Sequence, residues 1–231
     1  MNIYYDSELS KKLEGMFRAK FQEAEEERME VHLSDLCKCP IKCFNRLTGH
    51  KSEFDSKSIG MMLIGMVGQE MFQSLFPEEQ REYEPDAELP EGMRIPAHID
   101  IFMDMEFPSE IKWSRRKIFR GSDVSPSWIL QLSGYLARTH KLIGYMIILN
   151  VISATIHCFK MIMTEEDIVR RNAELIEGKA QIVLAVSRGD ASTLEPWPKD
   201  CKYCDYRPTR KKKKAGEWFC PHYIVPKRKK T

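Results

Sequence analysis

Residues 94–113 read RIPAHIDIFMDMEFPSEIKW and contain the clearest structural pattern in the chain. Apolar side chains alternate through the first half of this stretch, at positions 95, 97, 99, 101 and 103, as in a strand with one buried face. A turn at residues 104–108 leads to a second short strand at 109–113. We therefore predict a β-hairpin, in which residues ten positions apart can lie side by side.

Three of the charged side chains in this stretch form a candidate site. Asp100 lies inside the apolar strand, where a carboxylate without a partner is costly. Glu110 and Lys112 share one face of the second strand, because side chains repeat every two residues. Two carboxylates can hold Mg²⁺ or Mn²⁺ through oxygen, and a lysine beside the cation can orient or deprotonate an attacking water. An Asp followed by Glu-x-Lys is a weak signal alone, since such residues are usually surface charges.

The elements around the hairpin predict a mixed α/β domain. A helix at 57–76 is apolar and contains Gly60, Gly65 and Gly68, which indicates close packing rather than exposure. A helix opens at Ser125-Pro126, with proline in the first helical position. The other expected elements are a helix at 7–30, strands at 145–151 and 154–161 that form a second hairpin, and a helix from about 165 to 188. Helices, strands, helix, strands and helix in this order are typical of one α/β domain.

A further pair of polar residues lies on the helix after the hairpin. Gln131 and Tyr135 are four positions apart, so they share one helix face. Taken by itself, this pair is equally typical of a buried tyrosine with a neighbouring amide.

The order of these residues resembles a known family. Asp100, then Glu110-x-Lys112, then Gln131-x-x-x-Tyr135 are similar to motifs II and III and the QxxxY motif of RecB-like nucleases in the PD-(D/E)XK superfamily. The resemblance implies a restriction-endonuclease-like core, which is a mixed sheet flanked by helices. It also implies metal-dependent hydrolysis of DNA.

The resemblance assigns roles to individual residues. Asp100, Glu110 and the backbone carbonyl of Ile111 would hold Mg²⁺ or Mn²⁺, and Lys112 would position the attacking water. Gln131 and Tyr135 would hold the scissile strand. These nucleases usually carry Gly-x-x-x-His on a preceding helix, with the histidine as a metal ligand. Here the matching place ends in Gln69, which we expect to assist the metal through its amide oxygen.

Six of the seven cysteines gather near the two ends of the sequence. Cys37, Cys39 and Cys43 lie early, and Cys201, Cys204 and Cys220 lie late. We expect a cytoplasmic protein, where disulfides are rare, so this distribution indicates a metal or cluster site. Cys158 lies in an apolar strand and is expected to be a small core residue.

The cysteines match a subset of the same family. CRISPR-associated RecB-like exonucleases, and relatives in repair helicase–nucleases, hold a [4Fe–4S] cluster with one ligand before the nuclease core and three after it. Cys39, followed by Pro40, resembles the early ligand, and Cys201, Cys204 and Cys220 resemble the late three. This implies a cysteine-bound cap formed from both termini, with Cys37 or Cys43 able to replace Cys39. Zinc is the alternative, because Cys201, Cys204, Cys220 and His222 would make a Cys₃His site.

Composition and charge fit a DNA-processing protein. The chain has 42% hydrophobic and 30% charged residues, as in an ordinary globular protein. No apolar run approaches the roughly 18 residues that span a membrane. Residues 207–231 hold ten Lys or Arg and one Glu, a net charge of +9, which leaves −7 for the rest of the total of +2. This basic segment is either a phosphate-binding surface or a solvated tail.

The sequence thus predicts three regions and one function. Residues 1–56 carry the first helix and the early ligand, 57–190 form the nuclease core, and 191–231 form the cysteine cap and basic tail. We expect a metal-dependent DNA nuclease, an exonuclease acting on single strands or DNA ends in CRISPR adaptation or in recombination and repair. The alternative is a catalytically weak subunit that binds DNA ends or assembles with a protein partner. The retention of Asp100, Glu110 and Lys112 favours the enzyme.

Overall fold

The structure is a computed structural model of the chain. It describes residues 29–50, 56–85, 93–197 and 220–222, together with the single positions 8, 15, 16, 19, 201, 204 and 206. Most of the helix expected at 7–30 lies outside the described residues. So does the basic segment at 207–231, apart from residues 220–222.

A five-stranded mixed sheet forms the centre of the molecule. Its strands run in the order β1 (Arg81–Tyr83), β2 (Ile99–Met103), β3 (Phe107–Ser114), β4 (Ile143–Asn150) and β5 (Thr155–Ile162). The β2–β3 and β4–β5 pairs are antiparallel, which confirms both predicted hairpins. The β1–β2 pair is also antiparallel, whereas β3 and β4 are parallel.

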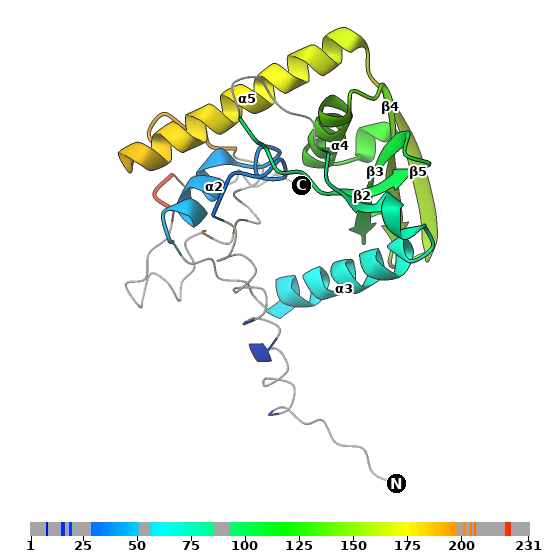
Figure 1. Cartoon of the computed structure of the whole chain (residues 1–231). Helices are drawn as coiled ribbons and strands as arrows, with labels where there is room; N and C mark the ends of the chain where they lie inside the picture. Colours follow the sequence, from blue (N-terminus) through cyan, green and yellow to red (C-terminus); the bar gives the residue numbers. More distant parts are fainter. Residues whose placement is uncertain are drawn as a thin grey trace.

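Helices flank the sheet on both sides, as Figure 1 shows. Helix α3 (Ser56–Gln73) contacts β2 and β3, while α4 (Pro126–Thr139) lies against β3 and β4 and is itself contacted by α5 (Glu165–Arg188). The long α5 continues past the sheet to α2 (Pro40–Leu47). The mixed sheet with flanking helices predicted from the sequence is therefore confirmed. Within the described part of the chain, no helix is long and apolar enough to cross a membrane.

Local sequence signals explain where the predicted helices begin and end. Pro126 stands in the first turn of α4, and His140 ends that helix in the left-handed conformation, with φ of 52°. The hydroxyl of Thr164 accepts a hydrogen bond from the Asp167 N–H at 3.1 Å, and the Asp167 carboxylate accepts one from the Thr164 N–H at 3.1 Å. This reciprocal cap fixes the start of α5.

Two hydrophobic layers hold the sheet in place. One lies on the α4 side and includes Ile99, Leu132 and Ile148, all fully buried. The other lies on the α3 side and includes Ile101, Ile111 and Ile147, with Phe72 and Trp113 packed against them. Strand β2 thus contributes a buried side chain to each layer, Ile99 to one and Ile101 to the other.

The sequence pattern misplaced some boundaries. The first strand of the hairpin was expected from residue 94, but β2 begins at Ile99. Pro96 has no N–H to donate to a neighbouring strand, and its carbonyl instead accepts a hydrogen bond from Leu33 at 2.9 Å. The short elements α2 and β1 were not predicted, because eight and three residues are too few to show a clear period.

Two packing expectations were wrong. Cys158 is exposed rather than in the core, because α3 contacts β2 and β3 and leaves that face of the edge strand β5 uncovered. Gly60 and Gly65 face open space, with no atom near where a Cβ would lie. Gly68 alone among these three glycines is required for close approach, since a Cβ there would overlap the Trp113 ring.

Candidate active site

The predicted carboxylates meet where the β2–β3 pairing ends. The register pairs Ile101 with Ser109, and the next step along the two strands reaches Asp100 and Glu110. At this point the Ile111 N–H donates its hydrogen bond to a side chain, Asp100 Oδ2, at 2.7 Å instead of to a backbone carbonyl of β2. The hairpin predicted from the sequence therefore does bring these two residues onto neighbouring positions.

Glu110 and Lys112 form a buried ion pair beside Asp100. The Lys112 ammonium contacts Glu110 Oε1, and the Glu110 side chain is 0% exposed while that of Lys112 is 24% exposed. Glu110 Oε2 has no hydrogen-bond partner in the described part of the chain. A buried carboxylate oxygen without a partner is costly, which indicates that this site is arranged for another cation or donor.

Burial shifts the ionisation of this cluster. It raises the pKa of Asp100 to about 6, and the negative charge of Glu82 acts in the same direction, while Lys112 and the Ile111 N–H act in the opposite direction. Burial also lowers the pKa of Lys112, which Asp100 partly offsets. A partly buried lysine with a lowered pKa loses its proton more readily, as a group that activates water must.

The raised pKa of Asp100 predicts a pH-dependent cost to stability. A group with a higher pKa in the folded than in the unfolded state destabilises the fold once it ionises. Metal-free wild-type protein should therefore lose stability, relative to Asp100→Asn, as the pH rises from about 4 to about 6. The amide keeps the acceptor for the Ile111 N–H without the charge.

Thermal melting in a chelator measures this effect. We expect Asp100→Asn to melt on the order of 5 °C above wild type at pH 7, and at the same temperature as wild type near pH 4. Equal melting temperatures at both pH values would show that Asp100 ionises without cost.

Gln69 lies at the site, against the carboxylates of Asp100 and Glu82. Its Nε2 donates to Asp100 Oδ1 at 2.9 Å and to Glu82 Oε1 at 3.1 Å. The amide nitrogen, rather than the oxygen expected to assist a metal, thus faces the two carboxylates. Gln73 lies one turn later on α3, and its Nε2 donates to Glu82 Oε1 at 2.6 Å and to the Asp100 carbonyl at 2.8 Å.

Sequence reasoning missed Glu82 and Gln73. The spacing of Gln69 and Gln73 is a detectable signal, because residues four apart share a helix face. Glu82 gave no signal, since it lies in the three-residue strand β1 and its partners come from other elements.

The predicted strand-binding pair lines a cleft that contains Asp100. The cleft has a volume of about 380 Å³. Gln131 and Tyr135, both on α4, form part of its lining, and the Gln131 amide donates to the Tyr135 hydroxyl at 2.8 Å. His98 also lines the cleft. Residues from β1, β2 and α4 thus meet around one space.

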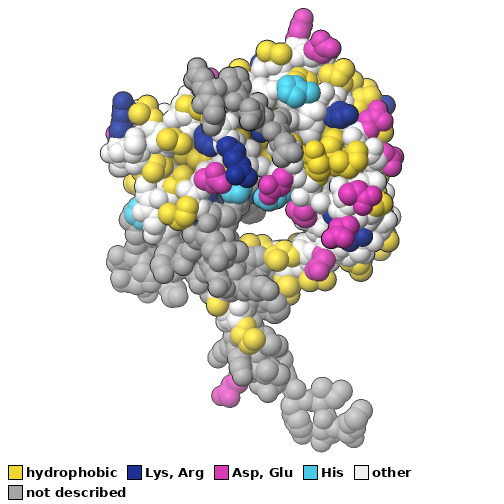
Figure 2. All heavy atoms as spheres, viewed as in Figure 1, with side chains coloured by type: hydrophobic (Ala, Val, Ile, Leu, Met, Phe, Trp, Pro, Cys, Tyr) yellow, Lys and Arg dark blue, Asp and Glu magenta, His cyan; other side chains and the backbone are white. Residues whose placement is uncertain are grey.

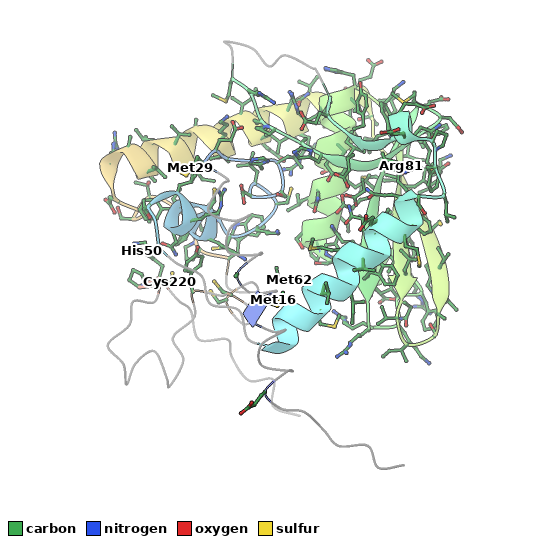
Figure 3. All side chains as sticks on the ribbon, turned by 60° about the horizontal axis from the view of Figure 1, so that its bottom comes forward. Met16, Met29, His50, Met62, Arg81 and Cys220 are labelled. Atoms are coloured by element: carbon green, nitrogen blue, oxygen red, sulfur yellow. The ribbon has the colours of Figure 1, made fainter. Side chains whose placement is uncertain are left out.

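A second pocket lies on the other side of Gln69, between α3 and β3. It has a volume of about 450 Å³ and is lined by Gln69, Lys112, Trp113 and the methionines Met61, Met62 and Met66. Figure 3 shows Met62 on α3. Gln69 lines this pocket and donates to Asp100, which lines the cleft.

Four cysteines line a separate cavity of about 200 Å³. They are Cys39, Cys201, Cys204 and Cys220, the same four expected as cluster ligands. Cys37, Cys43 and Cys158 do not line it. Figure 3 shows Cys220 near α2, far from Arg81 and the carboxylate site. The two predicted sites are therefore distinct in space.

The thiols of this cavity influence one another. Burial raises the pKa of Cys220, and Cys39 and Cys201 raise it further. Burial also raises the pKa of Cys39, whose sulfur accepts a hydrogen bond from the Trp197 N–H at 3.5 Å. His222, the zinc alternative's fourth ligand, also lines the cavity. Among the residues that the structure describes, no three His, Cys, Asp or Glu form a ready-made metal site.

Comparisons with known proteins add a structural likeness. No family model matches the sequence, and no curated protein matches it. The crystal structure of SSO0001 superposes with a TM-score of 0.57 at 16% sequence identity, covering 90% of this chain and 98% of that chain. At this identity the likeness shows a shared fold alone.

Proposed function

We propose that the protein is a metal-dependent nuclease that hydrolyses DNA phosphodiester bonds. The observation that carries the proposal is the meeting of Asp100, Glu110 and Lys112 at the end of the β2–β3 pairing. The resemblance to RecB-like nucleases supports a restriction-endonuclease-like description of this fold and a role in processing single strands or DNA ends.

The residues at the site fit a divalent cation. Asp100 and Glu110 offer carboxylate oxygens, and the Lys112 ammonium already occupies a cation's position against Glu110. Mg²⁺ or Mn²⁺ held there would polarise a phosphodiester and acidify a bound water. Lys112 would orient that water, and the Ile111 carbonyl would complete the oxygen donors.

The cleft beside Asp100 is where the DNA strand would bind. Gln131 and Tyr135 line the same cleft as Asp100, and Tyr135 is 2% exposed with its hydroxyl held by Gln131. A fixed hydroxyl–amide pair can hold a phosphate or base edge without ordering a flexible side chain. We propose that this pair holds the strand next to the scissile bond.

We also propose that the cysteine cavity holds a [4Fe–4S] cluster. Four thiols line one cavity, and four thiolates are the usual ligand set of such a cluster. The buried Asn45 also lines the cavity, and its side chain hydrogen-bonds to Cys220. An N–H donor directed at sulfur is a common second partner of cluster ligands.

A cleavage assay with matched lysine variants tests the nuclease proposal. Purified protein is incubated with single-stranded DNA labelled at either end, in Mg²⁺, Mn²⁺ or chelator. We expect cleavage that needs metal and falls at least about 100-fold in Lys112→Met. Lys117→Met, which removes the same charge from an exposed loop position, should cleave normally.

The outcomes separate the candidate functions. Equal cleavage by both variants would assign the activity to a contaminant and contradict the proposal. Metal-independent DNA binding by wild-type protein, without cleavage of any substrate tested, would favour the end-binding or assembly subunit.

A further inference from the structure

The carboxylate that faces the cleft beside Asp100 is Glu82 rather than Glu110. Asp100 and Glu82 both line the cleft, whereas Glu110 does not and is 0% exposed. Glu82 is exposed to solvent. A cation entering with a DNA phosphate through this cleft therefore meets Asp100 and Glu82 first.

The sheet register places Glu82 directly beside Asp100. Arg81 pairs with Ile101 and Tyr83 with Ile99, so Glu82 and Asp100 are opposite each other on β1 and β2. Glu82 has a φ of 45°, in the left-handed region that residues other than glycine rarely adopt. Such a conformation is kept where the surrounding structure requires the side chain in one place.

Two glutamines hold the pair of like charges together. Gln69 Nε2 bridges Glu82 Oε1 and Asp100 Oδ1, and Gln73 Nε2 bridges Glu82 Oε1 and the Asp100 carbonyl. Both amides bind the same oxygen of Glu82. On β3, on the other side of β2, Glu110 Oε2 has no hydrogen-bond partner among the residues described.

We propose that Glu82 is an acidic ligand of the divalent cation, paired with Asp100 on the cleft side, and that Gln69 is a positioning residue. This inference rests on the proposed nuclease function. Mg²⁺ is typically held by one or two carboxylates together with substrate phosphate and water, which the Glu82–Asp100 pair can supply. Glu82 thereby compensates for the ligand that is lost where Gln69 stands in the family's histidine position.

Metal binding to charge-neutral variants tests the role of Glu82 directly. Mn²⁺ affinity is measured by calorimetry and by electron paramagnetic resonance for wild type, Glu82→Gln and Glu84→Gln. Glu84 carries the same charge two positions away, where it contacts His98 at 3.2 Å, so it controls for long-range electrostatics. We expect Glu82→Gln to weaken Mn²⁺ binding about 10- to 100-fold and Glu84→Gln to bind as wild type does.

A second variant distinguishes lost ligation from lost structure. The double change Gln69→His with Glu82→Gln replaces the carboxylate by an imidazole from α3. We expect it to regain part of the Mn²⁺ affinity relative to Glu82→Gln, because the imidazole adds a nitrogen donor, softer than an amide oxygen, beside Asp100. Failure of the double variant to regain any affinity, in a folded protein, would contradict the compensation.

Chemical labelling of wild-type protein gives a readout without any substitution. Carbodiimide coupling followed by mass spectrometry reports the accessibility of each carboxylate. We expect Mn²⁺ to slow labelling of Glu82 and to leave labelling of Glu84 unchanged. Suppose that wild type binds Mn²⁺ and cleaves DNA, while Mn²⁺ does not protect Glu82 from labelling and Glu82→Gln binds Mn²⁺ normally. The proposed role of Glu82 is then wrong and the nuclease proposal stands. If wild type binds no Mn²⁺, both are wrong.

Discussion

Glu110→Gln is expected to abolish DNA cleavage without unfolding the protein. The substitution keeps the volume of a side chain that is 0% exposed and removes its charge, while Lys112 remains partly exposed and still has Asp100 nearby. We expect cleavage to fall by about 1,000-fold or more, as for loss of a group that stabilises charge in the transition state.

Melting temperature with and without Mg²⁺ separates catalysis from folding. The metal-free variant should melt within about 3 °C of wild type. A saturating cation that binds the folded state should raise the melting temperature of wild type and raise that of Glu110→Gln much less. Glu106→Gln, an exposed position in the turn between β2 and β3, is the matched control and should behave as wild type. Normal cleavage by Glu110→Gln would remove the carboxylate site from the mechanism.

The second large effect is expected from the cysteine cavity. Serine at Cys39, Cys201, Cys204 or Cys220 should bleach the brown colour of anaerobically purified protein and lower its iron content. Cys39 is separated from Cys201 by the sheet and all of its flanking helices, so shared ligation closes a very long loop. Loss of that closure should cost on the order of 4 kcal/mol, or roughly 10 °C in melting temperature.

Two other cysteines provide controls of different kinds. Cys43 is buried in the same hydrophobic cluster but does not line the cavity, so Cys43→Ser should lower stability through packing and keep the iron. Cys158→Ser changes an exposed side chain and should alter neither property. Full metal content in Cys39→Ser, together with zinc lost in His222→Ala, would identify a local zinc site instead.

The hairpin and its charges could be read from the sequence because they follow short periods. Alternation every two residues fixes which side chains share a face of β3, and ten residues suffice to bring Asp100 beside Glu110. The pair Gln131 and Tyr135 was similarly accessible, since a helix repeats within four residues. Motif order then connected these local patterns.

Contacts between distant, short elements could not be read in this way. Glu82 belongs to a strand of three residues, and its place beside Asp100 depends on how β1 joins the sheet edge. The orientation of the Gln69 side chain also depends on the pairing of β1 with β2, because the Gln69 amide donates to Glu82 as well as to Asp100. The exposure of Cys158 depends on how far α3 extends across the sheet, which no local pattern records.

The arrangement of the cysteine cavity has a consequence for how the protein is made. Cys39 leaves the ribosome early, and Cys201, Cys204 and Cys220 follow after every strand of the sheet has been synthesised. The cavity cannot be complete until Cys220 has been synthesised, so the strands that carry the carboxylate site have time to fold first. A nascent chain stalled before Cys201 would carry the whole hairpin and its acidic residues without the closure between its ends.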